Sequence, residues 1–381
     1  MDPRTGRIEA ALGEGGDIAW FRAPGRVNLM GDHTDYNEGF VLPAAIDRDC
    51  LIAVRPRADG RLVVRSLDVV PDEAVVEVAA DGTDEPAQVE PRWGRYVAGV
   101  VRALAERKRR SVGMDAVLSS TVPRGSGLSS SAALEVASAL ALCHVAGFGL
   151  PARDLALACQ HAEQIATGVP CGIMDQLVSF EGKGGAALLI DCRSIECRPV
   201  PIPAEIAILA VHSGLPRALA DSAYAERRAA CEATAARLGL QALRDAAPED
   251  VADDPFARHV VAENRRVLDT AQAIRAGELE HLGPLFAASH ASLRDDYRVS
   301  TPELDSLVRL LVDEGALGAR LTGAGFGGCA VALARSAEAP GIAERACGRY
   351  VAETGLAPQA FLCRAVDGAA RVVSARDQSD L

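Results

Sequence analysis

Several features that mark common protein classes are missing from this 381-residue chain. Its ten cysteines are scattered singly, with no C-x-x-C pair and no zinc-like spacing against the seven histidines. No apolar run approaches the length of a membrane span, and residues 1–16 hold no apolar core long enough for a signal peptide. These absences favour a reducing cytoplasm, in which the cysteines act mainly as small buried hydrophobic residues.

Positive charge is also in short supply. The chain has 40 Lys and Arg against 52 Asp and Glu, a net charge of −12 and a pI near 5.2. This balance argues against nucleic-acid binding and against an anionic membrane surface. The one basic run, residues 107–110, follows a helical apolar pattern and is expected to be a solvated helix end. An acidic body still permits a polyphosphate ligand, since a local glycine loop and a metal ion can hold the phosphates.

The chain is long enough for two domains that share one cleft, or for one unusually large domain. Its 49% hydrophobic and 24% charged residues are ordinary for a globular protein. We place a soft boundary in the proline-punctuated segment 199–203, which gives domains 1–200 and 201–381. The periodicity predicts a mixed α/β fold, with Asp154 as a helix N-cap. The predicted strands are 41–54, 62–66, 75–78, 116–122, 186–191, 206–212, 329–333 and 360–363. The predicted helices are 93–106, 132–145, 155–167 and 222–238, with 250–315 mostly helical.

The densest polar chemistry lies in residues 23–43, which read APGRVNLMGDHTDYNEGFVLP between strand-like apolar runs. Gly25 and Gly31 punctuate the segment, as expected where the backbone turns or approaches a ligand. Its carboxylates can accept hydrogen bonds from paired hydroxyls, and its imidazole can donate or accept one. The segment therefore suits a hydroxyl-rich ligand, and the alternative is a solvated loop with an ordinary charged surface.

Residues 123–133, PRGSGLSSSAA, follow a predicted strand and open a predicted helix. Glycines let backbone amides approach a polyphosphate, serines add hydroxyl donors, and the helix N-terminus favours negative charge. The loop is not a Walker A motif, because no Gly-Lys-Ser/Thr follows. Since glycine-serine turns before helices are common, the loop alone leaves a purely structural role open.

Two more segments present side chains or backbone from shaped turns. In GVPCGIMDQ, residues 168–176, two glycines and a proline precede Asp175, and Glu163 lies on the preceding predicted helix. The alternatives are a helix N-cap for Asp175 and a plain surface acid for Glu163. In RLTGAGFGG, residues 320–328, the glycines indicate either a ligand contact or a bulge at a sheet edge.

These motifs carry a family resemblance. Residues 23–43 and CGIMDQ resemble galactokinases, and the two glycine loops resemble the wider superfamily of galactose, homoserine, mevalonate and phosphomevalonate (GHMP) kinases. The matches appear in family order from residue 22 to about residue 333. The resemblance implies a two-domain α/β (α+β) architecture, with an N-terminal S5-like βα domain, a C-terminal ferredoxin-like domain and the active site in the cleft between them.

The resemblance also implies a reaction and its residues. The reaction is transfer of the ATP γ-phosphoryl to the anomeric hydroxyl of galactose, by a monomer or weak homo-oligomer whose partners are small molecules. The implied catalytic residues are Asp175 and Arg26, and the implied Mg²⁺ ligands are Ser131 and Glu163. The implied sugar contacts are Asp32, His33, Asp35, Gly172 and Tyr224, with Arg217 near the catalytic centre. The implied nucleotide contacts are Gly125, Ser126, Gly127, Leu128, Ser129, Ser130, Ser131 and Trp93; for Trp93 and its neighbour Tyr96, plain core packing is an equal alternative.

One departure from the family pattern stands out. The usual Gly-Glu-His is here Gly31-Asp32-His33, and the missing methylene retracts the carboxylate by on the order of 1 Å. Another sugar, such as an N-acetylated hexosamine, an arabinose or a uronic acid, therefore stays an alternative to galactose. A galactose- and ATP-binding regulator without catalysis is a third reading, but the intact GLSSSAA loop and the presence of Asp175 disfavour it.

Overall fold

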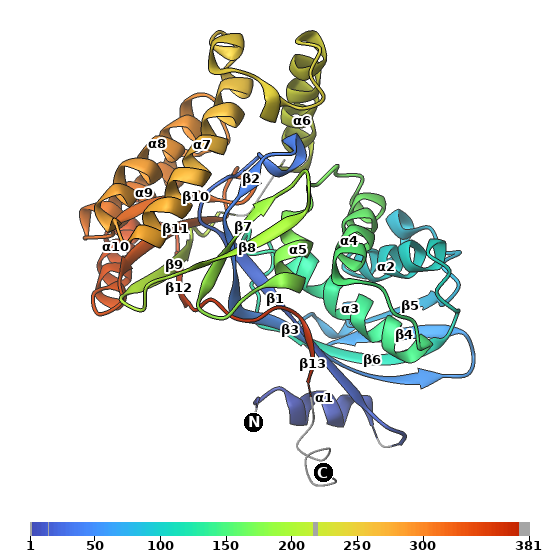
Figure 1. Ribbon diagram of the computed structural model, residues 1–381. Helices are drawn as coiled ribbons and strands as arrows, with labels where there is room; N and C mark the ends of the chain where they lie inside the picture. The colour runs from blue at the N-terminus through green and yellow to red at the C-terminus, as the bar shows by residue number, and fades with distance from the viewer. Residues whose placement is uncertain (1, 14, 216–219, 373–381) are drawn as a thin grey trace.

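The computed structural model describes residues 2–13, 15–215 and 220–372, and Arg217 lies outside them (Figure 1). Within these residues the chain forms three β-sheets with helices packed against them, the mixed α/β fold that the sequence predicts. The largest sheet has the strand order β13-β1-β3-β6-β4-β5. Its strands are β1 (Ala19–Asn28), β3 (Pro43–Arg57), β4 (Arg61–Ser66), β5 (Val75–Ala79), β6 (Gly113–Ser120) and β13 (Ala370–Val372).

The apolar pattern of β3 explains why this sheet is covered on both faces. Successive strand residues point to opposite faces, so Leu51 and Ala53 pack with Ile8 on α1 (Thr5–Leu12). The intervening Cys50 and Ile52 join the main core under the helices. These helices are α2 (Gly94–Glu106), α3 (Ser130–Ala146), α4 (Ala152–Thr167) and α5 (Met174–Glu181).

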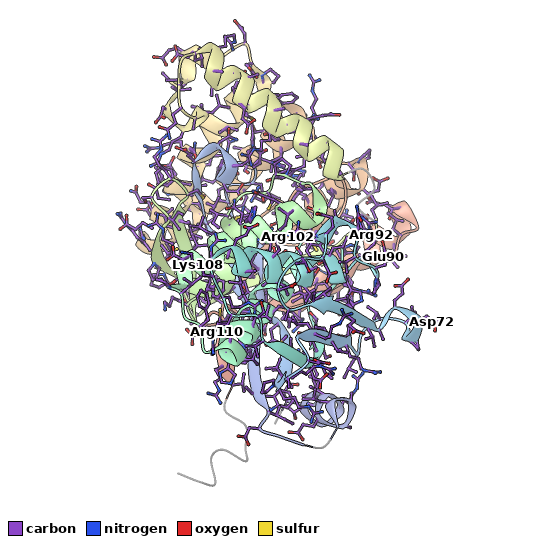
Figure 2. All side chains as sticks on the ribbon, turned by 90° about the vertical axis from the view of Figure 1, so that its right-hand side faces the viewer. Asp72, Glu90, Arg92, Arg102, Lys108 and Arg110 are labelled. Carbon is purple, nitrogen blue, oxygen red and sulfur yellow. The ribbon has the colours of Figure 1, made fainter. Side chains whose placement is uncertain are left out.

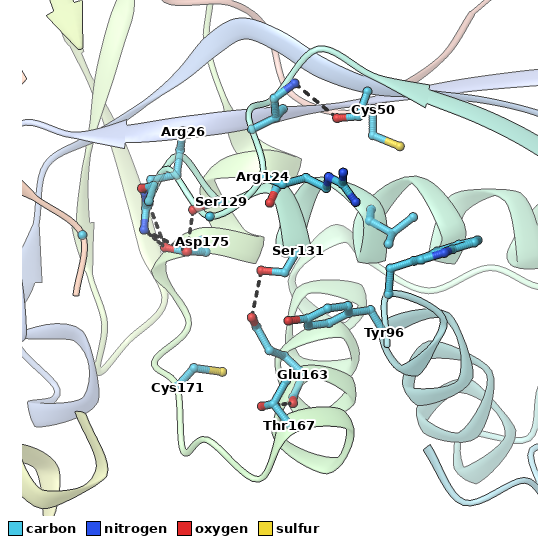
Figure 3. Close-up of a pocket in the computed structure, with 18 of the residues that line it drawn as sticks. Arg26, Cys50, Tyr96, Arg124, Ser129, Ser131, Glu163, Thr167, Cys171 and Asp175 are labelled. Carbon is cyan, nitrogen blue, oxygen red and sulfur yellow. Dashed lines mark hydrogen bonds and ion pairs between the residues drawn. The ribbon is translucent and has the colours of Figure 1, made fainter. Parts of the chain in front are cut away.

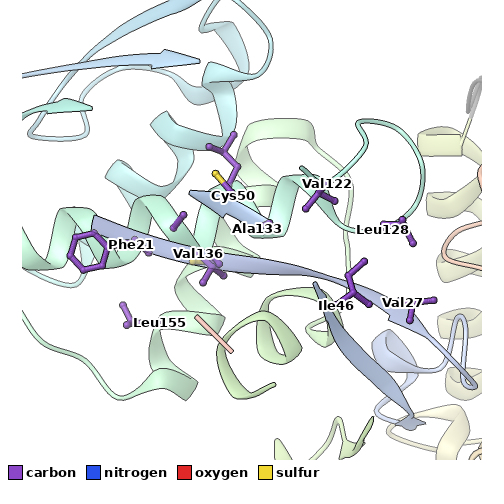
Figure 4. Packing of buried hydrophobic residues seen from close by; sticks show 14 of the residues in the cluster. Phe21, Val27, Ile46, Cys50, Val122, Leu128, Ala133, Val136 and Leu155 are labelled. Atoms are coloured by element: carbon purple, nitrogen blue, oxygen red, sulfur yellow. The ribbon is translucent and has the colours of Figure 1, made fainter. Parts of the chain in front are cut away.

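Helix α3 lies at the centre of this core and is apolar on nearly all sides, as the sequence predicts. It packs on β1 and β3 and is flanked by α2, α4 and α5. Figure 4 shows Ala133 and Val136 of α3 near Phe21 and Cys50 of the sheet. A helix buried in this way holds its N-terminus firmly, and that terminus forms one end of the site described below.

The C-terminal half contributes an antiparallel sheet with the order β10-β11-β9-β12. Helices α7 to α10 gather around it, at the left of Figure 1. The strands are β9 (Ile206–His212), β10 (Gly318–Thr322), β11 (Cys329–Arg335) and β12 (Gln359–Cys363). The helices of this half are α6 (Ala220–Arg237), α7 (Pro255–Ala276), α8 (Leu282–Asp295), α9 (Pro302–Asp313) and α10 (Ala339–Thr354). A third sheet, of β2 (Phe40–Val41), β7 (Ala186–Asp191) and β8 (Glu196–Pro201), lies beside α5 and α7.

Two local predictions are wrong. Helix α4 begins at Ala152 with Pro151 as its N-cap, so Asp154 lies in the first turn, where its charge faces the positive end of the helix dipole. The basic run after α2 is only partly solvated, since Arg109 is buried and donates to the Ala80 carbonyl at 2.7 Å. Figure 2 shows Lys108 and Arg110 on the outer face, near Arg102 of α2.

The domain boundary near residue 200 stays a prediction. β8 ends at Pro201 and β9 begins at Ile206, so a connection does lie there. The last described strand, β13, pairs antiparallel with β1 and so returns to the first sheet. No helix among the described residues has both the length and the apolar character needed to cross a bilayer.

Candidate active site

A cavity of about 790 Å³ brings together segments that lie far apart in the sequence (Figure 3). We call residues 123–131 with Glu163 and Asp175 the phosphate wall, and residues 31–36 with Gly172 and Tyr224 the sugar wall. Both walls line the cavity, as do Gly323 and Ala324 of the second glycine loop. Of the predicted site residues, those on the cavity lining are Arg26, Asp32, His33, Asp35, Trp93, Gly125, Gly127, Ser129, Ser130, Ser131, Glu163, Gly172, Asp175 and Tyr224.

Ser126 and Leu128 do not line the cavity. Both are buried, and the Ser126 hydroxyl donates to the Pro123 carbonyl at 2.7 Å and accepts from the Leu128 amide at 3.3 Å. The two residues shape the loop from within. Any contact they make with a ligand stays a prediction.

Asp175 sits between two donors. Arg26 reaches its carboxylate with Nε at 2.8 Å and a terminal nitrogen at 2.9 Å, and the Ser129 hydroxyl donates to it at 2.5 Å. This bidentate, charge-assisted pair fixes the carboxylate and stabilises its negative charge. The N-cap of α5 is Ile173, which excludes the N-cap alternative for Asp175.

The phosphate wall can lie close to β1 because Gly25 has no side chain. A Cβ on Gly25 would lie 2.5 Å from the Leu128 carbonyl oxygen, which instead accepts from the Arg26 amide at 3.1 Å. Ser129 takes a left-handed conformation, φ 61°, directly before α3. The turn brings Ser130, Ser131 and the start of the buried helix to the cavity, an arrangement suited to phosphate.

Ser131 and Glu163, which the resemblance implies as Mg²⁺ ligands, lie side by side. The Ser131 hydroxyl donates to Glu163 Oε1 at 2.8 Å, and Gln176 Nε2 donates to the other carboxylate oxygen at 2.6 Å. Burial and the nearby charge of Asp175 raise the pKa of Glu163. Hydroxyl and carboxylate oxygens beside a phosphate loop fit Mg²⁺, which is bound by few protein oxygens together with phosphates and water. The described residues hold no cluster of three or more His, Cys, Asp and Glu that would serve as a self-contained metal site.

On the sugar wall, the Asp35 carboxylate lies directly against the backbone of Gly172. A Cβ on Gly172 would lie 1.8 Å from Asp35 Oδ2, so only glycine permits this approach. Burial raises the pKa of Asp35 to about 6, and the charge of Asp175 adds to the rise. The group is a stronger hydrogen-bond acceptor when it is ionised, because protonation turns one of its oxygens into a donor.

Aromatic rings surround His33. Its Nδ1 lies 2.9 Å from the Tyr36 hydroxyl, and its ring centroid lies 5.6 Å from that of Tyr224 and 4.7 Å from that of Tyr297. Burial lowers the pKa of His33 to about 3. The imidazole is therefore neutral at physiological pH, and one of its nitrogens carries no proton.

Asp32 is turned toward the protein. Its Oδ2 accepts from Arg320 at 2.5 Å and its Oδ1 from the Gly323 amide at 3.0 Å. The predicted sugar contact of Asp32 is untested by this geometry. The Arg320 partner was not predicted, and a pairing across 288 residues leaves no local sequence signal.

The sequence analysis also missed Arg124. It is exposed and lines the cavity, and Figure 3 shows its guanidinium turned into the cavity on the side of Tyr96. Its place between Pro123 and Gly125 of the phosphate loop was the available signal. Trp93 also lines the cavity, while its indole donates to the Glu73 carbonyl at 2.8 Å, so this residue serves the packing as well.

Three family models match the chain. They are the galactokinase galactose-binding signature at residues 10–56, the GHMP kinases N-terminal domain at 95–183 and the GHMP kinases C-terminal domain at 270–352. The chain also resembles a Methanococcus jannaschii mevalonate kinase in fold, with a TM-score of 0.67 at 19% identity over 93% of this chain and 100% of that one. Fold and site therefore define a small-molecule kinase of the GHMP superfamily.

Nearer relatives define the family. The chain is 44% identical to a galactokinase of Roseiflexus sp. over 94% of both chains, and 42% identical to one of Chloroflexus aggregans over the same shares. A crystal structure of Lactococcus lactis galactokinase complexed with galactose has a TM-score of 0.89 and 32% identity, over 95% of this chain and 97% of that one. The chain belongs to the galactokinase family.

Proposed function

We propose that this chain transfers the γ-phosphoryl group of ATP to the anomeric hydroxyl of galactose, giving galactose 1-phosphate and ADP. The observation that carries the proposal is the position of Asp175. Fixed by Arg26 and Ser129, it lines the same cavity as the phosphate loop and the sugar wall. The relatives are galactokinases, which supports galactose as the sugar, and one of them has been crystallised with galactose.

In the proposed reaction Asp175 orients the anomeric hydroxyl and is the group able to take its proton. The hydroxyl oxygen forms a bond to the γ-phosphorus while the bond from phosphorus to the β-phosphate oxygen breaks, and ADP leaves. Arg26 offsets charge on the transferring oxygens. Because this transfer passes through a loose transition state, positioning contributes more than a strong base.

The remaining roles follow the two walls. The proposed sugar contacts are Asp32, His33, Asp35, Gly172 and Tyr224. The backbone and hydroxyls of residues 125–131 hold the phosphates, and Trp93, Tyr96 and Arg124 bound the rest of the nucleotide. Mg²⁺ held by Ser131 and Glu163 would neutralise phosphate charge. We further propose a monomer or weak homo-oligomer without nucleic-acid or membrane partners. A cytoplasmic location completes the proposal, since all ten cysteines are free thiols.

A kinase for another sugar is the second candidate, because Asp32 stands where the family pattern has Glu. The test is ADP release measured across a panel of galactose, N-acetylgalactosamine, arabinose and galacturonic acid. Turnover of galactose with the highest kcat/KM supports the proposal. Turnover of another sugar without galactose would replace it, and galactose binding without ADP release would support the non-catalytic regulator.

A further inference from the structure

The two carboxylate oxygens of Glu163 have different neighbours. Oε1 accepts from the Ser131 hydroxyl at 2.8 Å, and Figure 3 shows this bond at the cavity. Oε2 accepts from Gln176 Nε2 at 2.6 Å, and Gln176 is fully buried and does not line the cavity. Glu163 therefore has one oxygen beside a cavity residue and the other bound to the protein interior.

The side-chain amide of Gln176 donates to two acids. The second acceptor is Glu135 Oε2, 2.9 Å from the same nitrogen, and Glu135 is also fully buried. Because a glutamine amide carries two N–H donors on one planar group, two acceptors on separate helices fix its orientation. The Gln176 Oε1 atom has no hydrogen-bond partner among the residues that the structure describes. The two donated bonds are therefore what this buried polar group contributes.

These bonds join three helices of the phosphate wall. Glu135 lies on α3, one turn after Ser131, and Glu163 lies on α4. Gln176 lies on α5, directly after Asp175. The three helices also pack against one another in the core. A displacement of α5 that moved Asp175 would therefore also move the donor that orients Glu163.

The orientation of this carboxylate matters for a magnesium ion. Mg²⁺ requires nearly ideal octahedral geometry, with oxygen ligands at about 2.0–2.1 Å, and so tolerates a misplaced ligand poorly. Residues that hydrogen-bond to a metal ligand typically contribute about 10- to 100-fold to metal affinity or activity. A donor on Oε2 leaves Oε1, the oxygen beside Ser131, to bind the ion.

We propose that Gln176 is a positioning residue for the metal ion, whose amide holds Glu163 Oε2 so that Oε1 faces the ion. Glu135 anchors that amide from α3. The inference rests on the proposed function, in which Ser131 and Glu163 hold Mg²⁺. Since neither Gln176 nor Glu135 lines the cavity, their effect should be confined to nucleotide that carries the metal ion.

The test measures binding of AMP-PNP, a non-hydrolysable ATP analogue, by titration calorimetry in excess EDTA and in saturating Mg²⁺. The ratio of the two Kd values is the gain in affinity from the metal ion. Gln176→Leu removes both donors, and we expect it to reduce this gain by about 10-fold or more. The Kd without metal and the galactose KM should stay within about 2-fold of the parental values. Gln176→Glu, which keeps the shape without the donors, should show the same loss.

Gln164→Leu is the matched control, since Gln164 adjoins Glu163 in the sequence but donates to the Cys171 carbonyl, at 3.0 Å. Its gain from Mg²⁺ should stay within about 2-fold of the parental gain. Glu135→Gln keeps an acceptor for the Gln176 amide and should also keep the gain, whereas Glu135→Leu should lose about 3-fold or more.

An unchanged gain in Gln176→Leu or Glu135→Leu would overturn the inference. An equal loss of affinity with and without Mg²⁺ would overturn it too, because that result indicates a distorted phosphate loop rather than a misplaced metal ligand.

A crystal structure of the parent protein with Mg²⁺, AMP-PNP and galactose decides the question if Gln176→Leu does not fold. We expect the ion on Glu163 Oε1, with Oε2 still within about 3.2 Å of Gln176 Nε2. An ion on Oε2, or a Gln176 amide beyond that distance, refutes the inference. Failure of the proposed function is recognised separately, because the parent protein would then show no gain from Mg²⁺ or no turnover of galactose.

Discussion

The phosphate wall is built mainly from short stretches of chain, whereas the sugar wall depends on partners far away in the sequence. On the phosphate wall, a glycine-serine turn and the start of a buried helix create the site locally, and Asp175 and Glu163 come from the next two helices. On the sugar wall, Asp32 depends on a residue 288 positions away and Gly31 on one 232 positions away. A local turn can be recognised as a motif, but a long-range partner has no fixed spacing that a reader of the sequence could use.

Among the variants that test this comparison of the two walls, the largest effect on activity is expected at Asp175. Asp175→Asn removes the charge that orients the hydroxyl and leaves Arg26 with an uncompensated charge, so kcat should fall by on the order of 10²–10⁴. Binding of ATP, measured by titration calorimetry, should change by less than about 3-fold, because the amide oxygen of Asn can still accept from Ser129 of the phosphate turn. Asp154→Asn, an exposed acid in the first turn of α4, is the control and should retain parental kcat. Near-parental turnover of Asp175→Asn would show that the catalytic assignment is wrong.

Gly172→Ala tests the sugar wall alone. The added Cβ would lie 1.8 Å from Asp35 Oδ2 and must displace that carboxylate. We expect a galactose KM raised by about 30-fold or more with an ATP KM within about 2-fold, a split that follows from losing one positioned ligand group. Gly149→Ala is the control, because its Cβ would meet nothing within 4 Å. Equal changes in both KM values would contradict the separation of the two walls.

Arg124 gives the complementary test on the nucleotide side. Arg124→Ala should raise the ATP KM about 5- to 20-fold with the galactose KM unchanged, the size of one charge-assisted contact in a partly solvated site. The effect should weaken as the salt concentration rises. Arg124→Lys should recover part of it, and Arg153→Ala, at an exposed position on α4, should have none. An unchanged ATP KM in Arg124→Ala would remove this residue from the nucleotide site.

The smallest effect concerns the acid of the sugar wall. Since the pKa of Asp35 is raised to about 6, its carboxylate is neutral below that pH, and the galactose KM should rise as the pH falls through 6. Ionisation of Asp35 favours galactose binding but lowers the stability of the folded protein. The loss of stability is complete above about pH 6 and vanishes below the pKa of Asp35 in the unfolded chain, which is near 4. Asp35→Asn should therefore raise Tm by a few degrees at pH 7.5 and not at pH 4. Equal Tm shifts at both pH values would rule out this electrostatic origin.

The sequence predicted the parts of the molecule that depend on local pattern. The buried α3 and the helical region that became α7, α8 and α9 followed from periodicity, whereas the pairing of Ser131 with Glu163 was implied by the family resemblance. Strand β10 was missed, because a short strand that is buried throughout lacks a clear alternation. Strand β8 was missed because it is mostly exposed and contains Pro199 and Pro201. Asp154 was a plausible N-cap, but the chain already turns into the helix at Pro151.

Within the site, the sequence identified which acids belong together but not which way each one faces. Asp32 and Asp35 lie in one motif, yet one pairs with an arginine inside the protein and the other lies against the backbone of Gly172. The difference arises because β10 brings Arg320 to Asp32, whereas the turn before α5 brings Gly172 to Asp35.

The pairing of β13 with β1 has a consequence for biosynthesis. Residues 370–372 cover the outer edge of a strand that is synthesised long before them, and the Arg364 amide also donates to Asp47 near the start of β3. Until those late residues emerge, the growing chain presents an unpaired strand edge, the kind of surface that recruits chaperones or aggregates. Most strands of the first sheet are therefore synthesised long before the sheet can finish folding.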